Sequence, residues 1–118
     1  MQHRLCKAPA QTLSHFWLQL AQAEQNTAQC MRLLRYHWRG AQQRTLQQTL
    51  DWLIEQDYRP VARQHADKLH WILGDNDPLI PITCAATLPG RVTTISGGHL
   101  PMLTQPRQLQ ELIDARSA

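Results

Sequence analysis

Two short apolar segments, each followed by a turn that carries a polar side chain, most constrain the fold of this chain. Residues 69–81 (LHWILGDNDPLIP) are apolar up to Gly74 and then reach Asp77, and residues 92–106 (VTTISGGHLPMLTQP) are rich in β-branched residues before His99. Runs of this length and composition predict β-strands. In α/β proteins, sites are usually built just past the carboxyl ends of the strands. We therefore expect Asp77 and His99 to share one edge of a sheet.

The N-terminal half predicts three amphipathic helices, because apolar side chains recur there at intervals of three and four residues. The three apolar stripes are formed by Leu13, Phe16, Trp17 and Leu20, by Met31, Leu34 and Trp38, and by Leu46, Leu50, Leu53 and Ile54. The third helix is expected over residues 42–56. Gly40 is expected to end the second helix, since glycine often takes the left-handed position just past a helix.

The rest of the chain predicts shorter, alternating elements. These are a polar connector over residues 57–67, strands over 69–73 and 91–95, a brief helix over 82–88 and a last helix over 107–116. Strands that alternate with helices favour an α/β fold. The chain is thus expected to consist of a helical segment, residues 1–66, followed by a β-α-β-α segment, residues 67–118.

Length and composition exclude several classes of protein. The 118 residues suffice for one domain. No run approaches the roughly 20 apolar residues of a membrane-spanning helix, and the first residues lack the apolar core of a secretory signal. We therefore expect a cytoplasmic protein that does not bind membranes. The three cysteines form no C-x-x-C pair, which predicts reduced, packed thiols and neither a metal ion nor a cofactor.

Positive charge is concentrated in the first half of the chain. Residues 1–50 carry six Lys/Arg and one Asp/Glu, whereas residues 51–118 carry six and eight. The candidate partner-binding residues are Arg32, Arg35, Arg39 and Arg44, of which the first three are spaced i, i+3, i+7 on the second predicted helix. Such a face could steer an acidic protein towards the chain, or could simply be a solvated helix face. Nucleic-acid binding is not expected, because the net charge of +3 is small and no binding motif is present.

The pairing of an aspartate with a later histidine suggests acid–base chemistry. A catalytic histidine must be held in one tautomer by a carboxylate. Asp77 precedes His99 by 22 residues, which is room for one short helix and one strand. Gly97 and Gly98 allow a sharp turn before His99. Taken singly, each residue also fits a simple turn, since aspartate caps turns through its own side chain.

The two loops resemble those of a known enzyme family. Residues 74–81 (GDNDPLIP) are similar to the acid loop of the α/β-hydrolase superfamily, residues 96–101 (SGGHLP) to its histidine loop, and residues 46–64 to the end of its lid. Within that superfamily, the sequence resembles the esterases of biotin synthesis that demethylate pimeloyl-carrier-protein methyl ester. The resemblance implies that Asp77 is the acid and His99 the base of a catalytic triad, with Asp75 less suited as the acid. It also implies an acyl carrier protein as the partner of the arginines.

The chain departs from this family in what it lacks. It contains no G-x-S-x-G sequence, and its serines are Ser14, Ser96 and Ser117. We therefore expect the C-terminal portion of such a hydrolase, a helical lid followed by the last two strands and the C-terminal helix. The serine would come from a missing N-terminal half, through a separate chain or a longer gene product. The partner would be that half or, since an unpaired strand edge invites association, a second copy of this self-associating chain. Without a nucleophile and an oxyanion hole, the chain alone is expected to be inactive. Two alternatives stay open, a non-enzymatic helical module that binds an acidic protein and an inactive, truncated hydrolase.

Overall fold

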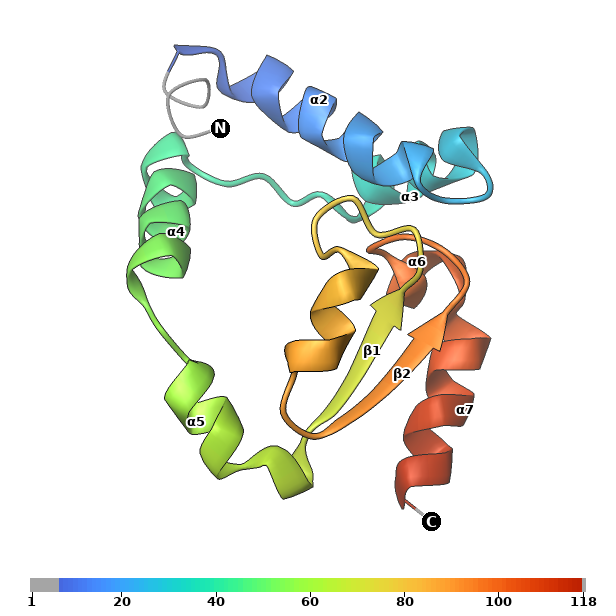
Figure 1. Cartoon of the computed structure of the whole chain (residues 1–118). Coiled ribbons are helices and arrows are strands. Elements are labelled where there is room, and N and C mark those ends of the chain that lie inside the picture. The colour runs from blue at the N-terminus through green and yellow to red at the C-terminus, as the bar shows by residue number, and fades with distance from the viewer. Residues whose placement is uncertain (1–6, 118) are drawn as a thin grey trace.

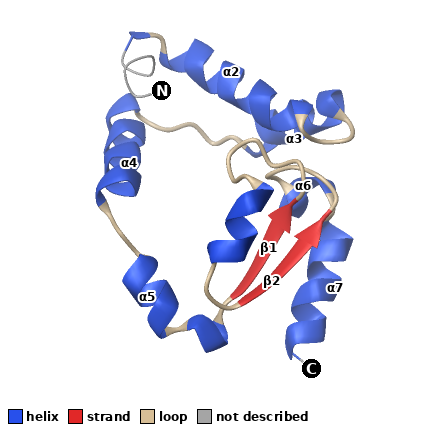
Figure 2. Cartoon of the chain, viewed as in Figure 1, coloured by secondary structure: helices blue, strands red, loops and turns tan. Residues whose placement is uncertain are grey.

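The computed structural model describes residues 7–117 and shows helices arranged around a small parallel sheet (Figures 1 and 2). The α-helices are α2 (Pro9–Gln22), α3 (Thr27–His37), α4 (Gln43–Glu55), α5 (Arg59–Gln64), α6 (Pro101–Thr104) and α7 (Pro106–Ser117). The 3-10 helices are η1 (Ala66–Lys68) and η2 (Ile82–Thr87), and the strands are β1 (His70–Gly74) and β2 (Arg91–Ile95). The expected α/β character is thus confirmed at the level of a mixed helical fold with a parallel strand pair.

The sheet brings the ends of the two predicted strands together. β1 and β2 are parallel, and their register runs from His70 beside Arg91 to Gly74 beside Ile95. A parallel pair requires a crossover connection, which here contains η2. Because the strands point the same way, the loops after Gly74 and Ile95 leave the sheet at one edge (Figure 1).

The most buried cluster lies beside the sheet, where α2 and α3 cross its carboxyl edge (Figure 1). It consists of Leu20, Ala21, Cys30 and Leu100, with Phe16, Met31, Leu34 and Leu103 packed against them. Asn26 caps α3, since its Oδ1 accepts a hydrogen bond of 3.0 Å from the Gln29 N–H. The helical hairpin is therefore anchored to the segment that follows β2.

The expectation that Gly40 ends the second helix is wrong. α3 ends at His37, and Trp38 is already extended with ψ of 122°. The Trp38 ring packs edge-on against Trp17, with 5.5 Å between ring centroids. This tertiary contact draws the chain away from α3 before Gly40, which lies in the connector to α4 with φ of 81°. The short helix α6 was also not expected from the sequence.

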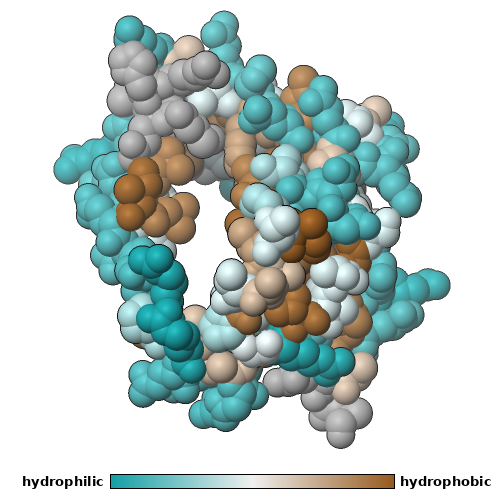
Figure 3. Space-filling view, viewed as in Figure 1, coloured by the Kyte–Doolittle hydropathy of each residue, from teal (hydrophilic) through white to brown (hydrophobic). Residues whose placement is uncertain are grey.

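Helices α4 and α5 form an arm that stands apart from the sheet (Figure 1). The apolar stripe predicted for α4 is poorly covered, since Leu53 is 63% and Ile54 70% exposed. The rings of Trp52 and Tyr58 contact each other at 5.8 Å between centroids. Figure 3 shows an opening between the arm and the sheet, with apolar side chains on the α4 side of it. The arm therefore holds its apolar residues near the surface.

The described shape is more open than that of a compact chain of this length. The Cα radius of gyration is 16.0 Å, whereas about 13.5 Å is expected for a compact domain of this size. The accessible area is 8584 Å², against about 6,600 Å² for a compact monomer of equal mass. The difference of about 2,000 Å² exceeds the roughly 800 Å² that each partner buries in a standard interface and is the size of one side of a large, obligate interface. Within residues 7–117, no helix has both the length and the apolar character needed to cross a membrane.

Candidate active site

Backbone hydrogen bonds join the two loops beyond the strand ends. The N–H of Asp75 donates to the Ile95 carbonyl oxygen at 2.9 Å, and the N–H of Asn76 donates to that of Gly97 at 2.8 Å. The Asp75 carboxylate accepts a further hydrogen bond of 3.0 Å from the Gly97 N–H. Asp75 therefore ties one loop to the other.

Gly74 allows these loops to approach each other closely. A Cβ atom at this position would overlap the carbonyl oxygen of Gly98 and would lie 2.5 Å from that of Gly97. Both neighbours are backbone atoms, which cannot rotate away as a side chain can. The end of β1 thus requires glycine, because the histidine loop passes directly over it.

Asp77 and His99 meet at this edge of the sheet. His99 Nδ1 lies 2.8 Å from Asp77 Oδ2. The other carboxylate oxygen of Asp77 accepts hydrogen bonds from the N–H groups of Leu79 at 2.8 Å and Ile80 at 3.0 Å. The Asp77 side chain is 5% exposed and that of His99 37% exposed. A buried, fixed carboxylate therefore orients an accessible imidazole, whose Nε2 can exchange a proton with a reacting group.

The environment keeps Asp77 ionised. Burial on its own would raise the pKa of Asp77, but the hydrogen bond from His99 and those from the N–H groups of Ile80 and Leu79 outweigh it. The pKa of Asp77 consequently lies below its usual value. A carboxylate beside a histidine holds the imidazole in one tautomer and stabilises the imidazolium that forms when it takes up a proton.

We expect acid to destabilise the fold through Asp77. Its pKa is lower in the folded than in the unfolded state, so the stabilisation is complete above the unfolded value of about 3.9 and is lost as the pH falls through the folded value. Urea unfolding between about pH 6 and pH 2 should show this loss. In Asp77→Asn, the free energy of unfolding should fall less steeply as the pH is lowered over the same range. An unchanged acid dependence in Asp77→Asn would argue against the prediction.

The four arginines do not form one helix face. Arg32 and Arg35 lie on α3, but Arg39 follows its end and Arg44 belongs to α4. The predicted i, i+3, i+7 face is therefore wrong at Arg39, because α3 ends at His37. All four side chains are exposed, and in the described part of the chain none of them forms an ion pair. Arg39 Nη1 donates to the Tyr36 carbonyl oxygen at 3.3 Å.

In the described part of the chain, the serines, the possible metal ligands and the groove beside α5 do not extend the Asp77–His99 site. Within the described residues no serine hydroxyl bonds to His99, and no cluster of His, Cys, Asp or Glu could hold a metal ion. A groove of about 740 Å³ lies between α5, Trp71 and Pro89. Trp71 and Pro89 stand near the amino ends of the strands, so this groove is at the far end of the sheet from His99.

The Cys30 thiol is expected to react much more slowly with iodoacetamide than that of Cys84. Cys30 is 1% exposed, and its burial, followed by the nearby Glu24 carboxylate, raises the pKa of the thiol. Since the thiolate is the reactive form, both effects slow alkylation. Cys84 is half-buried. Mass spectrometry of timed labelling would give both rates, and equal rates would contradict the prediction. Cys6 lies outside the described residues.

Sequence reasoning missed one buried carboxylate near the pair. Glu24, in the turn between α2 and α3, is 7% exposed, and its Oε1 accepts a hydrogen bond of 3.0 Å from the Leu100 N–H. A signal was present, because Glu24 is the only acidic residue among the first fifty. Its contact with a residue 76 positions later could not be foreseen from local patterns.

No protein-family model, no curated protein and no solved structure matches this chain.

Proposed function

We propose that this chain is the C-terminal portion of a carboxylic-ester hydrolase of the α/β-hydrolase superfamily. His99 is the general base and Asp77 the acid that orients it. The observation that carries the proposal is the 2.8 Å contact between His99 Nδ1 and Asp77 Oδ2. Support also comes from the parallel strands that present both loops at one edge, where α/β proteins build their sites.

In this mechanism His99 Nε2 takes the proton of a serine hydroxyl as the serine oxygen bonds to the ester carbonyl carbon. The imidazolium, stabilised by Asp77, then donates that proton to the alcohol oxygen as the acyl C–O bond breaks. A water molecule attacks the acyl-serine next, with His99 taking its proton and returning it to the serine oxygen. The carboxylic acid leaves, and both side chains are restored.

The serine is supplied from outside the described residues in this proposal. The sequence has no G-x-S-x-G, and a sheet of two strands is small for an independent unit. The excess of about 2,000 Å² in accessible area on this one chain is large enough for its side of an extensive interface with a further polypeptide. A second copy of this chain would also lack a serine in a G-x-S-x-G sequence, so we favour a polypeptide segment of different sequence as the source of the nucleophile.

The substrate class that we propose is the methyl ester of a pimeloyl group on an acyl carrier protein. The four exposed arginines, none of which forms an ion pair in the described part of the chain, are suited to an acidic protein surface. The same exposure favours the second candidate function, a binding module for an acidic protein without catalysis. Salt would weaken the binding of an acidic protein in both cases, so the salt dependence of binding does not separate the two candidate functions. A measurement of esterase activity does.

The first experiment is to read the DNA upstream of the Met1 codon in all frames for a segment that encodes a strand, a G-x-S-x-G turn and a helix. That segment should be co-expressed with this chain, labelled with a fluorophosphonate and assayed on p-nitrophenyl butyrate. We expect serine labelling and ester hydrolysis that His99→Gln abolishes. An unchanged rate of ester hydrolysis in the His99→Gln variant would overturn the proposal. The lack of any such segment would favour the binding module or an inactive, truncated hydrolase.

A further inference from the structure

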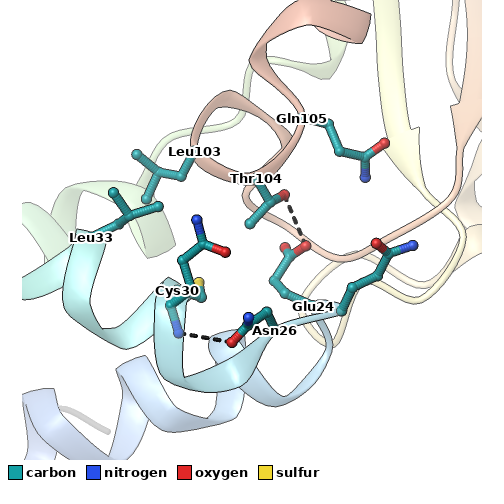
Figure 4. Close-up of a pocket in the computed structure, with 9 residues that line it drawn as sticks. Glu24, Asn26, Cys30, Leu33, Leu103, Thr104 and Gln105 are labelled. Carbon is teal, nitrogen blue, oxygen red and sulfur yellow. Dashed lines mark hydrogen bonds between the residues drawn. The ribbon is translucent and has the colours of Figure 1, made fainter.

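Glu24 is a buried carboxylate that the Asp77–His99 pair does not use. It lies in the turn between α2 and α3, against the segment that follows His99 (Figure 4). Its Oε1 accepts the N–H of Leu100 at 3.0 Å in a buried contact. The Thr104 hydroxyl lies 3.0 Å from its Oε2 and also 3.0 Å from the Leu100 carbonyl oxygen, so these two acceptors share its single proton. One side chain thus contacts both ends of the segment from Leu100 to Thr104.

The same carboxylate lies against the two glycines that precede His99. A Cβ atom on Gly98 would stand 2.8 Å from Glu24 Oε1, and one on Gly97 would stand 3.5 Å from Oε2. Glu24 therefore lies close beside Gly98, immediately before His99, and accepts a hydrogen bond from Leu100, immediately after it. This bracketing restricts the backbone position from which the imidazole projects.

The turn that carries Glu24 also reaches the acid loop. The carbonyl oxygen of Ala23 accepts a hydrogen bond of 3.3 Å from Asn76 Nδ2, one residue before Asp77. The α2–α3 turn is therefore joined to both loops of the candidate site. A cavity of about 110 Å³ lies on the other side of Glu24, towards Cys30 and Leu103 (Figure 4).

A buried carboxylate is costly unless hydrogen bonds compensate for its lost hydration. Here the N–H of Leu100 and the hydroxyl of Thr104 provide that compensation. The oxygen atoms of Glu24 consequently fix the histidine loop at both Leu100 and Thr104.

We propose that Glu24 is a positioning residue, which holds the backbone around His99 so that Nδ1 meets Asp77. This inference rests on the proposed function for its catalytic meaning, but the positioning itself is a property of the chain alone. Because Glu24 lies in the turn of the α2–α3 hairpin, this hairpin helps to position His99. Misplacement of a catalytic group by about 1 Å is enough to lower a rate strongly.

The test is the low-field proton resonance of His99 Nδ1–H in the full chain, observed by NMR and assigned by its loss in His99→Gln. We expect Glu24→Ala to lose the resonance or to speed its exchange with water by about tenfold or more. Glu24→Gln should keep it, because the amide oxygen can still accept the Leu100 N–H. Asn26→Ala is the matched control, since it removes a cap in the same turn without touching the histidine loop.

A folded Glu24→Ala chain with an unchanged resonance would overturn the proposal. Should Glu24→Ala fail to fold, Thr104→Val keeps the carboxylate and removes the hydroxyl, which contacts both Glu24 Oε2 and the Leu100 carbonyl oxygen. That variant is expected to broaden the His99 resonance and to speed amide exchange at Leu100 relative to Met102. No change in either quantity would equally overturn the proposal. These readouts need no nucleophile, so their result is independent of whether the chain supports ester hydrolysis.

Discussion

Replacing Gly74 with alanine is expected to destabilise the fold by more than about 4 kcal/mol. The new methyl group would overlap the Gly98 carbonyl oxygen and would lie 2.5 Å from that of Gly97. Relief of this overlap requires the histidine loop to move away from β1, which breaks the hydrogen bonds between the loops. Urea unfolding followed by circular dichroism measures the loss directly.

Gly40→Ala is the control for the effect of an added methyl group. Gly40 has φ of 81° and nothing within 4 Å of a Cβ atom, so only the left-handed backbone opposes alanine there, at a cost of about 1–2 kcal/mol. If Gly74→Ala unfolded within about 1 kcal/mol of the unmodified chain, the close approach of the two loops would be refuted.

Asp77→Asn is expected to lower kcat by about 10⁴-fold in the assembled hydrolase that we propose. The carboxylate oxygen that faces His99 Nδ1 at 2.8 Å can only accept a hydrogen bond. An amide can instead donate to Nδ1, which leaves the proton on Nε2 and removes the base. The measurement is steady-state hydrolysis of p-nitrophenyl butyrate by the two co-expressed parts.

Asp75→Asn provides the matched comparison, because it changes the same residue type two positions away. The amide oxygen can still accept the Gly97 N–H that Asp75 binds at 3.0 Å, so kcat should change by no more than about threefold. Equal losses in the two variants would show that the loop as a whole, and not the Asp77 carboxylate, determines the rate.

Local patterns in the sequence predicted the elements that carry the site. A short apolar run closed by Gly74 indicated the first strand. β-Branched residues indicated the second, and β2 runs from Arg91 to Ile95 as expected. The pairing of Asp77 with His99 followed from their positions after two neighbouring strands, and the contact of 2.8 Å agrees with it. These features could be predicted because the residues that determine a strand end and the following turn are neighbours in the sequence.

Contacts between distant segments were beyond such patterns. Trp38 leaves α3 early because its ring packs on Trp17, which no helix signal encodes. The stripe on α4 indicated a buried face, yet Ile54 is 70% exposed, since periodicity shows that a face is apolar without showing what covers it. The contact of Glu24 with Leu100 spans 76 residues and depends on how the hairpin crosses the sheet edge.

The arm formed by α4 and α5 gives the molecule two separate levels of stability. Neither helix has a buried residue, so each can open without disturbing the cluster around Leu20. Amide protons of the arm should exchange with an opening free energy near zero, whereas those of β1 and β2 should report global unfolding. A protease will accordingly cut the link around Gln56 in molecules whose sheet is intact. Proteolytic survival would then measure the fluctuations of the arm and not the stability of the fold.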